Sequence, residues 1–398
     1  MTISGFNHTM LTRRLLHLCA ATLIFTSAAQ AGKNLVFFGT YTTNEGKGKG
    51  IYAASLEDQE GAIGEVSLAA ETPNPSFLAV DPTGKFLFAV NEMGAKPGGK
   101  DGGAVTSFSI APDGKLTQIS QVSSGGTGPC HLAVEKTGKM LVIANYNSGS
   151  VAGIAVAPDG RLSTAPVATF QNQGKGPVAG RQEGPHAHGV TFPPDYKAAF
   201  VCDLGADKIF AYGVKPDTYQ FYPIPTLTLS LKPGDGPRHL TFSADGRFAA
   251  VGNELSNTIT SYNYDAAKGA FAQAGIISSL KDEKSKNTLS EVYFHSNGRT
   301  FYAANRGDDS IAVFKLDASN GSLKFPVWFP SGGKNPRQFG LDDSGRWMFI
   351  CNQGAADAPE SDNVTVYKVD KPSGKPMPPV HKTLKIPTPV CALVVPMK

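Results

Sequence analysis

The chain has 398 residues and a formal net charge of +4 at pH 7, with 41% hydrophobic and 18% charged residues. This nearly neutral balance gives no electrostatic basis for binding nucleic acid or an anionic membrane surface, so neither is expected as a partner. The length exceeds what one simple sandwich needs and implies several domains or a repeat architecture.

Residues 1–31 have the pattern of an export signal. Arg13 and Arg14 precede the apolar run LLHLCAATLIF, which is too short for a permanent membrane span, and AQA at 29–31 offers the small residues that a signal peptidase reads. We predict cleavage after this motif, a periplasmic or secreted location, and a single mature domain of residues 32–398. Loss of the two arginines lowers the net charge to +2. The arginine pair fits both a Sec and a twin-arginine signal.

The mature sequence is built from repeats of a β-hairpin pattern. Each copy has an apolar alternating run, a turn with Asp, Ser or Asn and Gly, a second apolar run, and a closing Asn or Asp. The closing residues are Asn91, Asn145, Asp203, Asn253, Asn305 and Asn352, at spacings of 54, 58, 50, 52 and 47 residues. LVFFGTYT indicates a seventh copy, because Thr40 lies 51 residues before the first of them.

A third strand follows most copies, as in VTSFSI and KIFAYGV, and a fourth often follows a Gly turn, as in DGKLTQISQV. Four short strands per repeat, with almost no helical periodicity, predict an all-β fold: a seven-bladed β-propeller of four-stranded antiparallel blades. The first segment, LVFFGTYT, and the last, TPVCALVVP, each lack a hairpin partner, so we expect them to complete one blade and close the ring. Two β-sandwiches would not give one repeat through the full length.

The cysteines and the longer loops give weaker signals. Cys130, Cys202, Cys351 and Cys391 have neither metal-binding nor scaffold spacing, and we interpret them as small apolar residues in or beside strands. A bridge between Cys351 and Cys391 is compatible with an oxidising compartment, and the sequence leaves it open. The irregular stretches 94–103, 171–184 and 354–363 are predicted to be functional or mobile loops on one rim.

The hairpin geometry predicts where side chains converge. The start of a first strand lies beside the end of the second, so the residue fifteen positions before each closing residue should meet the residue directly after it at the tunnel mouth. The first set comprises Ser76, Cys130, His188, Arg238, Ser290 and Arg337. The second comprises Glu92, Tyr146, Leu204, Glu254, Arg306 and Gln353. Neighbouring blades therefore place histidine, glutamate and several arginines on one arc of the rim.

This combination suits a small anionic or oxygen-rich substrate. Arginine can bind a carboxylate and stabilise the oxyanion of acyl transfer, while His or Glu can activate water, and opening a lactone needs both. A single Arg–Glu pair is often only a structural ion pair. Asn91-Glu92 repeats an Asn-Glu dipeptide, so Glu254 can be partly a feature of the blade. His131 and His239 follow the tunnel positions by one residue, should point away, and are interpreted as structural.

Other kinds of site have little support. HExxH, GxSxG, phosphate-binding and dinucleotide-binding motifs are missing from the sequence. His186 and His188 could chelate a metal only with partners that are not evident, and arginines argue against a Ca²⁺ site in the tunnel. We expect neither a metal nor a cofactor.

GTYT, GPHAHGV, GPRHLTFSADGRFAAVGNEL, AANRGDDSIAVF and PTPVCALVVP together resemble the seven-bladed propeller lactonase family, over nearly all of residues 33–396. This family includes cytosolic 6-phosphogluconolactonases and the fungal carboxy-cis,cis-muconate cyclase. The resemblance implies an active-site set, which falls on His186, Arg238, Glu254 and Arg306. The hairpin register alone favours His188, so both histidines remain candidates.

The leading hypothesis is an exported, monomeric lactone hydrolase that needs no metal. One of the two histidines would activate water, with Glu254 orienting or sharing the proton. Arg238 and Arg306 would bind the carbonyl oxygen and a substrate anion, assisted by Arg337, with Glu92, Tyr146 and Gln353 as further substrate-binding candidates. Because export separates the protein from phosphorylated sugars, we expect a non-phosphorylated aldonolactone or a carboxylated lactone. The alternatives are a muconate lactone cyclase and a non-catalytic propeller that binds a ligand or a protein.

Overall fold

The computed structural model describes residues 1–2, 33–43, 47–57, 60–94, 102–358 and 360–397. The predicted export signal lies outside these residues. Residues 32–398 form one compact unit. Its described part is all-β, with seven antiparallel sheets and one short 3₁₀ turn, η1 (Pro225–Leu227), which confirms the predicted fold class. The described residues include no helix that is long and apolar enough to cross a membrane.

Six sheets are consecutive blades, each in the order of its strands along the chain. Blade 1 has β5 (Leu78–Val80), β6 (Phe86–Asn91), β7 (Ala104–Ile110) and β8 (Leu116–Ser123). Blade 2 has β9 (Pro129–Val134), β10 (Met140–Asn145), β11 (Ser150–Ala155) and β12 (Ala168–Gln171). Blade 3 has β13 (Ala187–Thr191), β14 (Ala199–Asp203), β15 (Lys208–Lys215), β16 (Gln220–Pro223) and β17 (Leu229–Ser230).

The next three blades repeat this arrangement. Blade 4 has β18 (Pro237–Phe242), β19 (Phe248–Asn253), β20 (Thr258–Asp265) and β21 (Ala270–Ser278). Blade 5 has β22 (Thr288–Phe294), β23 (Thr300–Arg306), β24 (Ser310–Leu316) and β25 (Leu323–Pro330). Blade 6 has β26 (Pro336–Leu341), β27 (Trp347–Asn352), β28 (Asn363–Asp370) and β29 (Lys375–Leu384).

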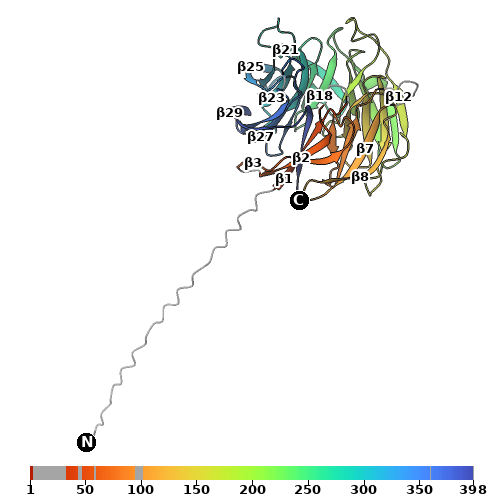
Figure 1. The fold of residues 1–398 in the computed structure, drawn as a ribbon. Coiled ribbons are helices and arrows are strands. Elements are labelled where there is room, and N and C mark those ends of the chain that lie inside the picture. Colours follow the sequence, from red (N-terminus) through yellow and green to blue (C-terminus); the bar gives the residue numbers. More distant parts are fainter. Residues whose placement is uncertain (3–32, 44–46, 58–59, 95–101, 359, 398) are drawn as a thin grey trace. The chain divides into compact units, whose positions relative to one another are not determined.

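Blade 7 joins the two ends of the described propeller. It contains β30 (Pro389–Pro396), β1 (Lys33–Thr40), β2 (Gly50–Glu57), β3 (Ala62–Ile63) and β4 (Ser67–Glu71). β1 pairs antiparallel with β30, with Leu35 opposite Val395, so the first strands of the propeller lie beside its C-terminus (Figure 1). This confirms the predicted closure and leaves no free inner edge at the junction.

The inner strands form a closed ring. β5, β9, β13, β18, β22, β26 and β30 contact one another in this order, and β30 contacts β5. The buried apolar side chains form seven clusters, one between each pair of adjacent blades. Because a blade is covered on both faces, its second strand is apolar throughout, as in MLVIAN and WMFICN.

The closing asparagines tie neighbouring blades together. The side-chain amide of Asn145 donates to the carbonyl of Ser124, at 3.1 Å, just after the outer strand of blade 1. Asn305 donates in the same way to Ser279, at 2.9 Å. Asn145 and Asn305 are therefore buried donors that fix one blade to the end of the preceding one.

A β-bulge interrupts the inner strand beside the closing residue in blades 2 to 6. In blade 4, Asn253 pairs with Pro237 and Gly252 pairs with His239, so Arg238 is the extra residue. The same shift leaves Cys130 extra in blade 2 and Arg337 extra in blade 6. In blades 3 and 5 two residues fall out of register, His188 with Gly189 and Ser290 with Glu291. In these five blades the predicted tunnel-mouth positions are thus bulge residues, whose side chains leave the regular alternation, whereas Ser76 of blade 1 precedes its inner strand.

The four cysteines of the described chain are buried free thiols. Cys202 and Cys351 lie in second strands, Cys130 and Cys391 in inner strands, as predicted for small apolar residues. The bridge between Cys351 and Cys391, which the sequence left open, is not formed in the structure.

Candidate active site

The bulge residues and the residues that follow the second strands meet at a cavity of about 280 Å³, here called the site cavity. It is lined by Tyr41, Glu92, Cys130, Tyr146, Arg181, His188, Glu254, Thr288, Arg306 and Arg337. Six of the nine residues predicted for the site are among them: His188, Glu254, Arg306, Arg337, Glu92 and Tyr146. His186, Arg238 and Gln353 lie elsewhere.

Glu254 is the centre of an ion cluster. Its Oε1 lies 2.6 Å from Arg181 Nη2 and 3.2 Å from Arg306 Nη2, and its Oε2 lies 3.1 Å from Arg238 Nε. Burial raises the pKa of this carboxyl, but the guanidinium groups of Arg306, Arg238 and Arg181 outweigh it and lower the pKa to about 2. Glu254 is therefore a permanent anion that holds arginines in place, and it is a poor acceptor for a proton.

Arg238 lies behind Glu254 and does not line the site cavity. Its side chain is 3% exposed, and its Nη1 donates to the carbonyl of Ser290 and lies 3.3 Å from His239 Nε2. Burial lowers the pKa of Arg238 to about 10, so the group stays charged at neutral pH. The Glu254 carboxylate, which Arg238 contacts, lines the cavity, and the contact of Arg238 with a substrate carbonyl stays a prediction.

His188 is the imidazole that reaches the site cavity. It is 5% exposed, and its Nδ1 is buried without a hydrogen-bond partner. Burial, followed by the charge of Arg238, holds the pKa of His188 well below 6.5, so the ring is neutral at pH 7. The edge of the ring faces Tyr146, at a centroid distance of 5.6 Å.

His186 lies outside the site cavity and packs against Tyr146, which lines it. Its ring stacks on Tyr146 at a centroid distance of 4.5 Å, and its Nδ1 lies 3.0 Å from the Tyr146 carbonyl. Its backbone N–H donates to Asp203 Oδ1 at 2.7 Å. Of the two candidate histidines, the structure brings His188 to the cavity and gives His186 partners that position Tyr146.

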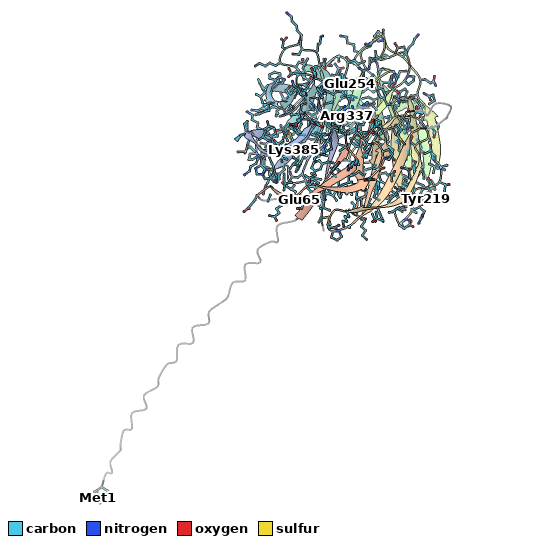
Figure 2. The ribbon with its side chains drawn as sticks, in the orientation of Figure 1. Met1, Glu65, Tyr219, Glu254, Arg337 and Lys385 are labelled. Carbon is cyan, nitrogen blue, oxygen red and sulfur yellow. The ribbon has the colours of Figure 1, made fainter. Side chains whose placement is uncertain are left out.

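Arg306 and Arg337 complete the cationic wall. Arg306 Nε donates to Thr288 Oγ1 at 3.0 Å while its Nη2 contacts Glu254. Arg337 lies over the ring of Tyr41, 5.2 Å from its centroid, and its Nη2 is 3.6 Å from Glu92 Oε2. Glu254 and Arg337 lie in the same part of the propeller (Figure 2). Burial lowers the pKa of Arg337, but its neighbours, first Tyr41 and Glu92, outweigh burial and raise this pKa.

Arg181 is a site residue that the hairpin register did not predict. It comes from the loop after β12, and its Nη2 also lies 3.4 Å from the Tyr146 hydroxyl. Its neighbour Gln182 is fully buried and donates to the Leu204 carbonyl and to Asp207 Oδ1, at 2.7 and 2.8 Å, which fixes the loop. The only sequence feature that pointed to this loop as part of the site was the length of the irregular stretch 171–184.

Tyr41 was also missed, although the repeat contains it. It follows Thr40, the closing residue of the seventh copy, and therefore has the same position as Glu92 in the next blade. Its hydroxyl donates to Glu92 Oε2 at 3.0 Å. Extending the register count to the seventh copy would have predicted it.

Two further cavities adjoin this region. A polar cavity of about 820 Å³ shares Tyr41 and Glu92 with the site cavity, and Gln353 lines it together with Asn74 and Asn147. A third cavity of about 400 Å³, here called the imidazole cavity, is lined by His131, His239, Glu291, Gln338 and several aromatic residues. It shares no lining residue with the site cavity, so His131 and His239 face away from the site as predicted.

The side chains at the site cavity that could bind a ligand by charge are mainly cationic. In the described parts of the chain, no group of three or more His, Cys, Asp or Glu side chains is placed to hold a metal ion. The groups that can stabilise negative charge at the site cavity are the guanidiniums of Arg181, Arg306 and Arg337.

Comparisons with known proteins identify the family of the chain. Residues 35–394 match the family model described as lactonase, 7-bladed beta-propeller. The 6-phosphogluconolactonase of Bacillus subtilis is 32% identical over 361 residues, covering 90% of this chain and 97% of the relative. That of Formosa agariphila is 30% identical over 344 residues, covering 85% and 94%. The structure of the periplasmic gluconolactonase of Pseudomonas aeruginosa superposes with a TM-score of 0.82 at 31% identity, covering 91% and 99%.

The chain therefore belongs to the seven-bladed β-propeller lactonase family. The enzyme class that this family defines is lactone hydrolase.

Proposed function

We propose that the mature protein is an exported hydrolase of a sugar lactone or a carboxylated lactone, and that it works without a metal in the site cavity. One observation carries this proposal. A buried neutral imidazole, His188, whose Nδ1 has no partner, lines the same cavity as three guanidinium groups. This pairs a proton acceptor with positive charge, as lactone hydrolysis requires.

The balance of charge favours the transition state over the substrate. Three arginines and two glutamates line the site cavity, and Arg238 adds a fourth guanidinium behind Glu254, so the groups carry a net charge of +2. The lactone is neutral at its reacting carbonyl, whereas the tetrahedral intermediate and the carboxylate product are anions. Positive charge fixed before the reaction stabilises these anions more than the substrate, which lowers the barrier.

The proposed reaction assigns the proton to His188. Its free nitrogen accepts a proton from water as the water oxygen bonds to the lactone carbonyl carbon. Arg306 and Arg337 stabilise the oxyanion that forms. The bond between this carbon and the ring oxygen then breaks, and the proton passes from His188 to the ring oxygen. The product is a hydroxy acid, which at neutral pH ionises and releases one proton to solvent.

In this account Glu254 orients the arginines and carries no proton. Its pKa of about 2 leaves it ionised throughout the working range, and its two oxygens are shared among three guanidinium groups. It stands between Arg238 below and the two arginines at the cavity, Arg181 and Arg306. Its proposed effect is to hold the guanidinium groups where the oxyanion develops.

The polar cavity supports a substrate with several hydroxyl groups. It opens beside Tyr41 and Glu92 and is lined by Asn147 and Gln353, which carry side-chain amides. Amides donate and accept hydrogen bonds, which suits the polyol part of an aldonolactone. Relatives named 6-phosphogluconolactonase and gluconolactonase act on sugar lactones, and the predicted export favours the unphosphorylated kind.

The test is proton release by purified residues 32–398 with a panel of sugar, aliphatic and carboxylated lactones. We expect turnover of at least one, undiminished by a chelator and reduced about 10²–10³-fold in Arg306→Ala, the loss typical of an oxyanion-stabilising group. Loss of activity with the chelator would refute the metal-free reaction. No turnover of any lactone would refute hydrolysis, and a change in muconate absorbance would then identify a cyclase.

Export and oligomeric state have separate tests. We propose a monomer in the periplasm or outside the cell, and the related gluconolactonase described as periplasmic supports this location. Cell fractionation of the full chain should place the mature protein outside the cytoplasm, and light scattering should give one mass of the mature chain. Replacing Arg13 and Arg14 together by lysine should block a twin-arginine signal and leave a Sec signal working.

A further inference from the structure

We propose that Glu291 and His239 form a buried positioning pair that holds the Arg238 guanidinium against Glu254. The catalytic meaning of the pair rests on the proposed function, whereas its geometry does not. Both side chains line the imidazole cavity and neither lines the site cavity, so they act through Arg238 and do not touch substrate.

The pair joins two neighbouring inner strands. His239 follows Arg238 in β18, and its Nδ1 lies 2.7 Å from Glu291 Oε1 in β22. The same oxygen accepts the backbone N–H of Val292 at 2.9 Å. Each side chain is 7% exposed, so the interaction is protected from solvent.

The contact with Arg238 fixes the position of the proton on His239. A guanidinium can only donate hydrogen bonds, so His239 Nε2, at 3.3 Å from Arg238 Nη1, must be the acceptor. The ring is neutral, because burial and the charge of Arg238 keep the pKa of His239 well below 6.5. Its proton is therefore on Nδ1, where it is donated to Glu291. The carboxyl thus selects the tautomer that Arg238 requires, as an acid does for the histidine of a catalytic triad.

The opposite tautomer would disturb the site. An N–H at Nε2 would face the N–H of Arg238, and a buried donor without an acceptor is destabilising. The guanidinium would turn away, and its contact with Glu254 Oε2 would be lost. Because Glu254 also holds Arg181 and Arg306, the disturbance would reach the cationic wall of the site cavity.

Packing holds the imidazole in this orientation. The rings of His131 and His188 lie edge-on to His239 at 4.9 and 5.0 Å, and Phe77 lies at 6.3 Å. His131 itself packs against Phe77 with tilted rings, at a centroid distance of 3.7 Å. With the ring held by its neighbours, Nε2 stays beside Arg238 and Nδ1 beside Glu291, and both partners favour the same tautomer.

The kinetic test compares Glu291→Ala with Glu291→Gln. The amide oxygen of Gln can accept the same two hydrogen bonds, and burial already raises the pKa of Glu291 to about 7, so a neutral group is tolerated there. We expect kcat to fall about 10–100-fold in the Ala variant, the effect typical of a group that orients a functional residue from behind, with KM nearly unchanged. The Gln variant should stay within about 3-fold of wild type.

A double-mutant cycle separates positioning from a general structural effect. Arg238→Ala should lower kcat, and adding Glu291→Ala to it should cause no further loss, because Glu291 acts only through Arg238. Independent, additive losses would overturn the proposal. So would a Gln variant that loses as much activity as the Ala variant.

Two measurements decide the geometry even if no lactone is hydrolysed. Nitrogen-15 NMR of the wild-type mature protein should show His239 as the neutral tautomer with its proton on Nδ1. The crystal structure of Glu291→Ala should show Arg238 Nε displaced from Glu254 Oε2, which is 3.1 Å away in the wild type. A proton on Nε2, or an unmoved Arg238, would overturn the pair, whereas an inactive wild type with both results as expected would overturn the proposed function alone.

Discussion

The site cavity and the imidazole cavity are built from adjacent residues of the same strands, yet their chemistry differs. Cys130 and Arg337 line the first, and the next residues along the chain, His131 and Gln338, line the second. The bulges at the inner strands send consecutive side chains to different cavities. The position of the charges therefore depends on one extra residue per strand.

Two buried glutamates, one in each cavity, show how the different surroundings change the pKa of a carboxyl group. Glu254 has three guanidinium partners and a pKa of about 2, whereas Glu291, for which burial dominates, has a pKa of about 7. Both are almost fully buried, so the difference comes from the number of neighbouring cations. The arginines of the site cavity can stabilise anions, whereas burial in the imidazole cavity disfavours the charged forms of His131, His239 and Glu291.

The largest expected effect separates the two histidines of GPHAHGV. His188→Gln should lower kcat by about 10²–10⁴-fold, because it removes the proton acceptor from the site cavity. His186→Gln, the matched control, should cost less than about 10-fold, since His186 acts only by stacking on Tyr146. Steady-state kinetics on the best lactone measures both. The reverse order would give the catalytic role to His186.

A smaller effect is expected from Arg306→Lys. Lysine keeps the charge but cannot contact Thr288 and Glu254 at the same time, so the oxyanion should lose a fixed donor and kcat should fall about 10–100-fold. The control is Thr241→Val in the imidazole cavity, which should leave kcat unchanged. Equal losses in the two variants would show that the cavities do not differ in function.

The third prediction concerns stability against pH. His131, His188 and His239 all have pKa values well below 6.5, so the unfolded chain takes up these protons first as pH falls. The contribution of these histidines to the free energy of unfolding is complete above pH 6.5 and is lost as the pH falls below it. The pKa of Glu291 is raised to about 7, so this group has the opposite effect: between pH 7 and 4.5 it adds stability as the pH falls. Stability should therefore fall from pH 6.5 towards pH 5.

A variant at His131, in the imidazole cavity, isolates the contribution of one of these histidines to the pH dependence of stability. His131→Asn keeps an acceptor for the backbone N–H of Val190 but cannot titrate. The slope of unfolding free energy against pH between 5.0 and 5.5 should decrease by about 1.4 kcal/mol per pH unit, the value for one proton. Urea unfolding at several pH values gives the slope. An unchanged slope would mean that His131 titrates normally in the folded protein.

The smallest expected effect is that of Tyr41→Phe. This variant removes the hydrogen bond from the tyrosine to Glu92 but keeps the ring beneath Arg337. Loss of one such bond corresponds to about 0.5–1.5 kcal/mol, so KM should rise about 2–10-fold with kcat nearly constant. A larger loss in kcat than in KM would indicate that Tyr41 takes part in the reaction itself.

The fold and the register of the site could be predicted from the sequence, because both repeat. The closing Asn recurs at the same step in each hairpin, and the residues that it indexes, such as Arg337 and Glu254, do line one cavity. The register also favoured His188 as a residue of the tunnel mouth. The pattern alone could not show that Arg238 lies behind Glu254, since the bulge at Arg238 depends on backbone pairing. Arg181 comes from a loop outside the repeat, so no periodicity pointed to it.

The most direct test of the central claim is a crystal structure of residues 32–398 with bound D-gluconate, the hydroxy acid that opening of glucono-lactone would give. We predict the carboxylate in the site cavity, within about 2.7–2.9 Å of the guanidinium nitrogens of Arg306 or Arg337, as charge-assisted hydrogen bonds require. His188 should lie beside it, with the hydroxyl groups extending towards Gln353. Gluconate bound only in the imidazole cavity, or not bound at any concentration that saturates a related gluconolactonase, would contradict the account.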